Sequence, residues 1–266
     1  MVSFDFGDAR FDLDADRDRS VLRFVLSQAL FGEATGVFCG RSLYAAETLE
    51  AAHFYVKQAR QELNHLTLFA DIFRELGMAP ESAHWVIRLL AAHNDYYPLK
   101  VLMEHALGEG MVLDIFRDVL LQTLPDDDER VPAIKKKLRV ICREEEEHVA
   151  WGEKETRRIL RQRPELKRAF YGLLELQLWL VPFAVQGLKQ RAPNHPVLAK
   201  LDGFVEHVKA RVWQQGRELG FAPETRPGRA ARALAVASGL ALLARSQLSR
   251  STSKLDKRYL EELGFR

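Results

Sequence analysis

The sequence has little of what marks several common protein classes. Its 266 residues include only two cysteines, Cys39 and Cys142, too few for a disulfide framework. With 39 basic and 37 acidic residues, the net charge of +2 indicates no general attraction to nucleic acid. The amino terminus has no basic segment followed by an apolar run, and the longest apolar stretch, residues 233 to 244, is too short to span a bilayer. We therefore expect a cytoplasmic protein without a nucleic-acid partner.

Alternating β-type patterns are also lacking. Apolar residues recur every three or four positions nearly throughout, and Gly, Pro and Asp clusters interrupt them, which is typical of helices joined by turns. The expected fold class is all-α, with helices over residues 19 to 44, 48 to 76, 96 to 123, 132 to 162, 166 to 190, 197 to 219 and 229 to 248. We expect an N-terminal segment at residues 1 to 18, a four-helix bundle at 19 to 162, and a helical extension at 163 to 266 that packs on the bundle.

Acids and histidines interrupt the apolar faces of the first four expected helices. Residues three apart share a helix face, so Glu62 with His65 and Glu145 with His148 form two inward Glu-x-x-His pairs. The first and third helices each have a single acid on the equivalent face. These acids are Glu33 and Glu109.

The spacing of these residues separates them from chance matches. The midpoint of Glu33 and Glu62 falls at the expected first turn, and that of Glu109 and Glu145 falls at residue 127, inside the expected loop. Each Glu-x-x-His therefore faces a lone Glu across an antiparallel hairpin. Two further matches, Glu50-x-x-His53 and Glu81-x-x-His84, have no such counterpart and are interpreted as surface residues.

Four carboxylates and two imidazoles on facing helices suit two metal ions. Carboxylates bridge and neutralise a cation pair, and each imidazole adds one neutral nitrogen. Buried acids without such a partner are costly. Helix bundles that supply one Glu from each of two helices and Glu-x-x-His from the other two are known di-iron and di-manganese proteins.

Residues 20 to 162 resemble the ferritin-like di-iron carboxylate superfamily. The family motif falls on Glu33, Glu62, His65, Glu109, Glu145 and His148, which the resemblance implies are both the metal ligands and the catalytic residues. It also implies a ferritin-like antiparallel four-helix bundle with two Fe ions, or a Mn/Fe or Mn pair. Gln61 and Glu144 would then be hydrogen-bond partners of the metal-bound histidines. The close spacing of the first hairpin and the long extension are most similar to the oxygenase branches, such as aldehyde-deformylating oxygenases and aromatic acyl-CoA epoxidases.

The resemblance predicts a non-haem di-iron oxygenase that acts on an apolar alkyl or aryl substrate. Phe38, Phe69, Phe73 and Trp151 lie on or beside the ligand faces, where they either line a substrate pocket or simply fill the core. Electrons must come from a separate ferredoxin or reductase, because the chain has neither a four-cysteine cluster site nor a glycine-rich flavin or nicotinamide fingerprint. Gly108 and Gly110 flank Glu109, which predicts a close helix approach or a local bulge there.

Other functions stay open at this point. Phe69 stands where a radical-generating ribonucleotide reductase subunit would carry Tyr, and two cysteines cannot build the usual rubredoxin-like module of rubrerythrins. A rubrerythrin-like peroxidase or a non-catalytic iron-binding or storage protein remains the alternative. A third hypothesis is a peripheral membrane contact through the helix expected at residues 229 to 248.

Overall fold

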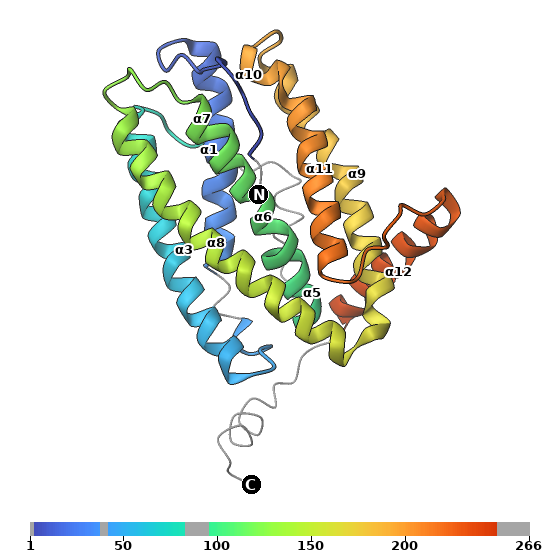
Figure 1. The fold of residues 1–266 in the computed structure, drawn as a ribbon. Coiled ribbons are helices and arrows are strands. Elements are labelled where there is room, and N and C mark those ends of the chain that lie inside the picture. Colours follow the sequence, from blue (N-terminus) through green and yellow to red (C-terminus); the bar gives the residue numbers. More distant parts are fainter. Residues whose placement is uncertain (1–2, 38–41, 83–95, 249–266) are drawn as a thin grey trace.

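The chain folds as an all-α protein, as the sequence predicts. The computed structural model describes residues 3 to 37, 42 to 82 and 96 to 248, and these ranges contain helices and turns but no strand. Four helices form the bundle on the left of Figure 1 and further helices cover one side of it. Phe38, Cys39 and His84 lie outside the described residues.

The bundle is built from two helical hairpins. Helices α1 (Asp16–Gly36) and α3 (Leu49–Glu75) form the first, and the second pairs a composite helix over residues 97 to 123 with α8 (Val131–Gln162). Helix α3 and the composite helix run in the same direction, opposite to α1 and α8 (Figure 1). The two hairpins pack on each other through α3 and α8. This arrangement brings the inner faces of all four helices to one interior.

The first helix is shorter than predicted. We expected it to reach residue 44, but α1 ends at Gly36, and a turn closed by the Ala46 N–H on the Ser42 carbonyl precedes α3. Gly36, at which α1 ends, is a weak helix former. Thr48 then caps α3 by accepting a hydrogen bond from the Ala51 N–H at 3.1 Å, so the predicted break before this helix is confirmed.

The third bundle helix is not a regular α-helix. It consists of α5 (Tyr97–Lys100), the π-helical segment η1 (Val101–Gly108), α6 (Glu109–Asp114), a second π-helical segment η2 (Ile115–Leu120) and α7 (Leu121–Thr123). An added Cβ at Gly108 would lie 2.7 Å from the Met103 carbonyl oxygen, five residues back, so glycine permits the π turn at this point. The bulge expected near Glu109 is therefore present, immediately before it.

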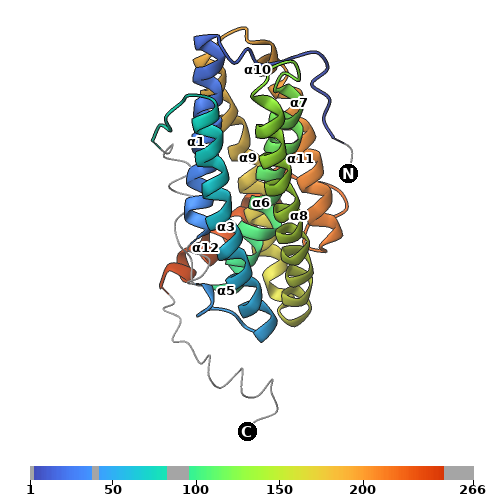
Figure 2. The ribbon, with the colours of Figure 1, turned by 90° about the vertical axis from the view of Figure 1, so that its left-hand side faces the viewer.

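The C-terminal helices cover one side of the bundle (Figures 1 and 2). A 3₁₀ turn, η3 (Pro164–Leu166), leads into α9 (Lys167–Arg191), which contacts α1 and η1 and is covered by α11 (Leu201–Glu218) and α12 (Arg229–Leu248). The short α10 (Pro196–Ala199) lies between α9 and α11. The sequence predicts a single helix over residues 197 to 219, and the structure divides it into α10 and α11. Within the described part of the chain, one stretch, Pro164–Arg191, is long and apolar enough to cross a membrane by length and composition, and half of its most apolar window is buried. A buried core helix meets the same criterion, so this stretch is weak evidence for a membrane span.

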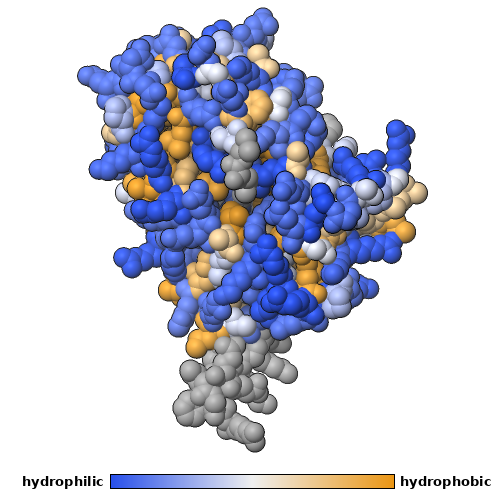
Figure 3. All heavy atoms as spheres, in the orientation of Figure 1, coloured by the Kyte–Doolittle hydropathy of each residue, from blue (hydrophilic) through white to orange (hydrophobic). Residues whose placement is uncertain are grey.

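Helix α12 has one face toward the protein and one toward the solvent. Ala235 is buried against α9, whereas Leu234 and Leu240 are 57% and 48% exposed. Hydrophobic atoms reach the surface at the right-hand edge of Figure 3, where α12 lies in Figure 1, although most of this face is hydrophilic. The helix therefore covers core residues, and its contact with a membrane stays a prediction.

Helices α9 and α12 touch backbone to backbone at Gly172, where an added Cβ would lie 1.8 Å from the Ala235 carbonyl oxygen. We expect Gly172→Ala to displace α12 and to lower the free energy of unfolding by about 3 kcal/mol or more. Gly187→Ala in the same helix is the matched control, because its Cβ would meet no atom of the described residues within 4 Å. The control should be neutral or more stable by about 0.5–1 kcal/mol, since Ala favours helix over Gly. Thermal denaturation of both variants checks the opposite signs, and equal melting temperatures would contradict the crossing.

Candidate metal centre

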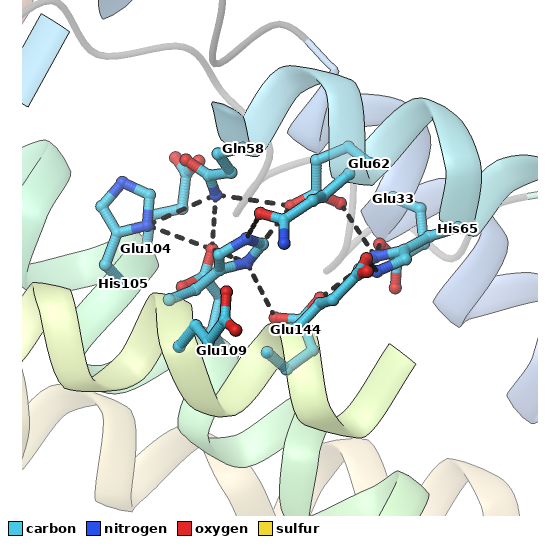
Figure 4. A network of polar contacts seen from close by, with 12 residues as sticks. Glu33, Gln58, Glu62, His65, Glu104, His105, Glu109 and Glu144 are labelled. Atoms are coloured by element: carbon cyan, nitrogen blue, oxygen red, sulfur yellow. Dashed lines mark hydrogen bonds and ion pairs between the residues drawn. The ribbon is translucent and has the colours of Figure 1, made fainter. Parts of the chain in front are cut away.

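The structure brings the six predicted ligands together in the interior of the bundle. Each comes from the inner face of its helix, and all six residues are at least nine-tenths buried. Figure 4 shows these side chains and their neighbours converging from α1, α3, α6 and α8. The set is Glu33, Glu62, His65, Glu109, Glu145 and His148.

One group of ligand atoms surrounds His65. Its Nδ1 lies 3.0 Å from Glu33 Oε2, 3.3 Å from Glu145 Oε1 and 3.6 Å from Glu62 Oε2. Three carboxylates from three helices thus converge on a single ring nitrogen. These four residues offer atoms that all lie within 4.8 Å of one another, close enough to hold one cation.

A second group surrounds His148 and uses the remaining oxygens of two of the same carboxylates. The His148 Nδ1 atom lies 3.5 Å from Glu145 Oε2, 3.7 Å from Glu62 Oε1 and 3.8 Å from Glu109 Oε1. Glu62 and Glu145 therefore direct one oxygen to each imidazole. The ring centroids of His65 and His148 are 6.4 Å apart. Cations would be held by the four residues around His65 and by Glu62, Glu109 and His148, with Glu145 Oε2 also directed at His148.

The outer nitrogens of both imidazoles have hydrogen-bond partners. The Nε2 atom of His65 lies 2.9 Å from Glu144 Oε2, and that of His148 lies 2.9 Å from Gln61 Oε1. Both partners are acceptors, so each Nε2 bears the hydrogen and donates it. When the ring is neutral, each Nδ1 then presents its lone pair to the side of the carboxylates, the orientation that a metal-ligating histidine needs. Gln61 and Glu144 thus each contact the histidine of the other Glu-x-x-His pair.

Burial opposes several negative charges at this place. Burial raises the pKa of Glu33 well above its ordinary value, and the neighbouring Glu145 adds to this effect. The pKa of Glu109 is also raised well above its ordinary value, again mainly by burial. For Glu145 burial acts in the same direction, but the adjacent imidazoles of His148 and His65 outweigh it and lower the pKa to about 2. The carboxylates need positive charge among them in order to be ionised together.

In the metal-free protein, protons on the two imidazoles supply that charge. Burial acts to lower the pKa of His148, but Glu109 and Glu145 outweigh burial and raise it to about 9. Burial also acts to lower the pKa of His65, and hydrogen bonds to Glu145 and Glu33 raise it far above its ordinary value. Metal ions and protons therefore compete for the same two nitrogen atoms.

Unsatisfied buried atoms indicate that the residues fit metal ions. Among the described residues, neither His148 Nδ1 nor Glu109 Oε2 has a hydrogen-bond partner, although both are buried. Buried polar atoms are nearly always paired, so two unpaired ones in a single cluster call for a missing partner. Both are electron-pair donors, and they belong to a nitrogen and carboxylate set that suits iron or manganese.

The predicted pocket residues are only partly near this centre. Trp151, one turn after His148, stacks on Phe54 with ring centroids 3.7 Å apart. Phe69 and Phe73 are buried core residues, and Phe69 packs on Phe116 at 5.5 Å. The fourth predicted residue, Phe38, cannot be placed because it lies outside the described residues.

The chance Glu-x-x-His matches lie away from the cluster where the structure describes them. Glu50 forms an exposed ion pair with Lys154 at 2.6 Å, and His53 is exposed. Glu81 pairs with Arg191 at 2.9 Å and with Arg23 at 3.4 Å. None of these three residues approaches the six ligands.

Sequence reasoning missed Gln58 and His105. Both are fully buried and lie beside Glu109: the Gln58 amide donates to Glu109 Oε1 at 2.7 Å, and His105 Nδ1 lies 3.0 Å from the same oxygen. A signal for them was available, because each precedes a predicted ligand by four residues and so shares its helix face.

Gly36 makes room for Glu62. An added Cβ at Gly36 would lie 2.6 Å from Glu62 Cδ, so we expect Gly36→Ala to push this carboxylate aside and to weaken metal binding by about tenfold or more. Gly32→Ala, one turn earlier in α1, is the control, because its Cβ would meet nothing within 4 Å among the described residues. Titration with Co²⁺ followed by visible absorption compares the two variants. Unchanged affinity in Gly36→Ala would show that Glu62 is not a ligand.

Comparisons with known proteins support the fold. No family model matches the chain, and no curated protein matches it. Among solved structures, the chain is similar to one described as protein 19 with aldehyde deformylating oxidase activity from Synechococcus, with a TM-score of 0.58 and 16% sequence identity over 88% of this chain and 100% of that one. At this identity the likeness concerns the fold alone. The chain therefore has a ferritin-like helical bundle, with a buried carboxylate and histidine cluster able to hold metal.

Proposed function

We propose that this protein is a non-haem di-iron oxygenase that oxidises an apolar substrate with O2 and electrons from a separate donor. The main supporting observation is the shared position of Glu62 and Glu145, whose oxygens are divided between the two imidazoles. With two iron ions bound, such a centre would supply the reduction of O2 and the oxidation of the substrate. The solved structure with aldehyde deformylating oxidase activity supports the same class of reaction.

The protein itself contributes burial and orientation. All six ligands are at least nine-tenths buried, so bulk water has little access to the site and the ionised carboxylates favour cations strongly. Glu144 and Gln61 fix the imidazole orientations through Nε2. The stacked pair of Phe54 and Trp151 lies against His148, with the Phe54 ring 5.8 Å from the imidazole. This aromatic wall suits an alkyl or aryl substrate better than a charged one.

The remaining parts of the proposal concern partners. The two electrons per turnover would come from a ferredoxin or a reductase. We expect this protein and its electron donor to lie in the cytoplasm. Phe38, Phe69 and Phe73 are proposed to extend the substrate pocket. A rubrerythrin-like peroxidase and an iron-storage protein are the competing functions.

Single-turnover chemistry distinguishes these functions. The iron-loaded protein is reduced chemically without O2, then mixed with O2 in the presence of fatty aldehydes, acyl thioesters or aryl acids. We expect consumption of about one O2 per di-iron centre together with an oxidised organic product detected by mass spectrometry. If no organic compound is changed and a ferric mineral grows, storage is the function. Rapid consumption of hydrogen peroxide in place of O2 would indicate the peroxidase.

A further inference from the structure

Gln58 is a buried amide that joins two of the proposed ligands. It lies on α3 four residues before Glu62, and none of its surface is exposed. Its Nε2 donates to Glu109 Oε1 at 2.7 Å and to Glu62 Oε1 at 3.3 Å (Figure 4). An amide nitrogen has two hydrogens, so these two carboxylates use both of them. Gln58 thereby connects α3 with α6 at the His148 end of the centre.

His105 holds the same oxygen from the other side. Its Nδ1 lies 3.0 Å from Glu109 Oε1, and with the ring hydrogen on Nδ1 the neutral imidazole donates to the ionised carboxylate. Phe54 and Trp151 fix the ring edge to face, with centroids 5.3 Å and 5.2 Å from that of His105. The imidazole is thus oriented by packing, and its hydrogen points at Glu109.

These contacts make the two oxygens of Glu109 unequal. Oε1 accepts from both Gln58 and His105, whereas Oε2 is buried and has no hydrogen-bond partner in the part of the chain that the structure describes. An oxygen whose lone pairs already accept two hydrogen bonds is a poor ligand for a cation. Oε2 therefore has its lone pairs free, whereas Oε1, which lies 3.8 Å from His148 Nδ1, has its own occupied by the two donors.

The opposite end of the centre has no equivalent. The position four residues before Glu145 is Ile141, and the position four residues before Glu33 is Ala29, neither of which has a polar side chain. Glu33 Oε2 instead lies 3.0 Å from His65 Nδ1. The hairpins are alike in their ligands but differ in what holds the terminal carboxylate.

The atoms of Glu104, His105 and Glu109 also lie within 4.8 Å of one another, as a third cation position would require. Two donors argue against a cation there. The Gln58 amide presents one hydrogen to Glu109 Oε1, and the Lys100 ammonium is ion-paired with Glu104. A cation needs lone pairs rather than hydrogens around it, so this cluster is better explained as a hydrogen-bonded support for Glu109.

We propose that Gln58 and His105 are positioning residues that restrict Glu109 to binding through one oxygen and so keep a coordination position open at the His148 end. This proposal requires the metal centre of the proposed function, but it does not require the proposed substrate or the proposed reaction. An open position is what an external ligand such as O2 or an anion needs at a metal centre.

Azide binding to the metal-loaded protein tests this proposal without turnover. The protein is loaded with Co²⁺, its metal content is measured, and azide is titrated while the visible absorption of Co²⁺ is recorded. In Gln58→Met, which keeps the size of the side chain but removes both hydrogens, Glu109 is free to bind through both oxygens. We expect two Co²⁺ per chain as in the unmodified protein, weaker absorption from a higher coordination number, and an azide dissociation constant raised by about tenfold or more. Ile141→Met, at the equivalent position of α8, should leave azide binding unchanged.

His105→Phe provides a second, independent variant. It preserves the aromatic packing and removes a single hydrogen bond, so azide binding should weaken less than in Gln58→Met. Unaltered azide affinity in a fully loaded Gln58→Met would overturn the proposal. If Gln58→Met does not fold or loses its metal, His105→Phe decides, and unaltered azide affinity there overturns it equally. Failure of the unmodified protein to bind any Co²⁺ would instead contradict the metal centre itself.

Discussion

Replacing Glu62 and Glu145 together by alanine should reduce the metal content from about two ions per chain to nearly none. Each of these carboxylates gives one oxygen to the His65 group and one to the His148 group, so their removal takes ligands from both positions at once. The variant leaves each imidazole with one terminal carboxylate, Glu33 or Glu109. Metal analysis after anaerobic loading with Fe²⁺ and removal of free metal measures the effect.

Two further variants make this result specific. Glu62→Gln/Glu145→Gln retains the side-chain volume, so metal loss in this variant with normal helical content excludes unfolding as the cause. Glu50→Ala/His53→Ala removes another Glu-x-x-His of the same helix, but these residues are exposed, and Glu50 contacts Lys154. Metal content should not change in that control. Retention of two ions in Glu62→Ala/Glu145→Ala would refute the assignment of the centre.

Metal binding at pH 7 should release about two protons per chain. In the metal-free protein the carboxylates raise the pKa of His148 to about 9 and that of His65 still more, so both imidazoles are protonated at neutral pH. A metal ion binds only the unprotonated Nδ1. Apparent affinity for the pair of ions should therefore rise by about 100-fold per pH unit below pH 9, and further if Glu33 and Glu109 also give up protons. Calorimetric titration in buffers with different ionisation enthalpies counts the protons.

The same protons set the pH dependence of stability. The pKa of His148 is raised on folding, so its contribution to stability is fully present below its unfolded pKa of about 6.5 and is lost as the pH rises through about 9. The melting temperature of the metal-free protein should fall as the pH rises over this range. The loaded protein should not, because its imidazoles have no proton to lose. Metal binding without any proton release at pH 7 would show that both imidazoles are already neutral.

Much of the fold follows from sequence periodicity. The apolar stripes predicted the all-α class, and most helix ends lie within a few residues of those expected, because Thr48 at the start of α3 and Gly77 just after its end are strong local signals. The glycines beside Glu109 predicted a bulge where η1 ends, but the early end of α1 and the second π-helical segment, η2, were not predicted. A π turn depends on which carbonyl a given N–H selects, and residue types determine this choice only weakly.

The six ligands could be predicted from the sequence because their positions satisfy two spacing rules at once. Glu62 and His65 share a face by the helical repeat, and Glu33 stands opposite them by the symmetry of the hairpin. Gln58 and His105 share the first property but lack the second, since no partner across their hairpins has a matching polar residue. Gln58 contacts Glu109 of the other hairpin, and His105 contacts the same oxygen from within the helix of Glu109. The spacing of residues across one hairpin does not predict either contact.

The π-helical segment before Glu109 has a consequence for tracing ancestry. A π turn holds about one residue more than an α turn, so a homologous helix that is regular over η1 would hold about one residue fewer there. One residue corresponds to about 100° of rotation on an α-helix, which decides whether an acid faces the core or the solvent. A homologue with a regular helix there aligns correctly on both sides of η1 only when a one-residue gap is placed within it. Ungapped pattern matching across residues 101 to 108 would therefore pair Glu109 with a neighbour of the true counterpart.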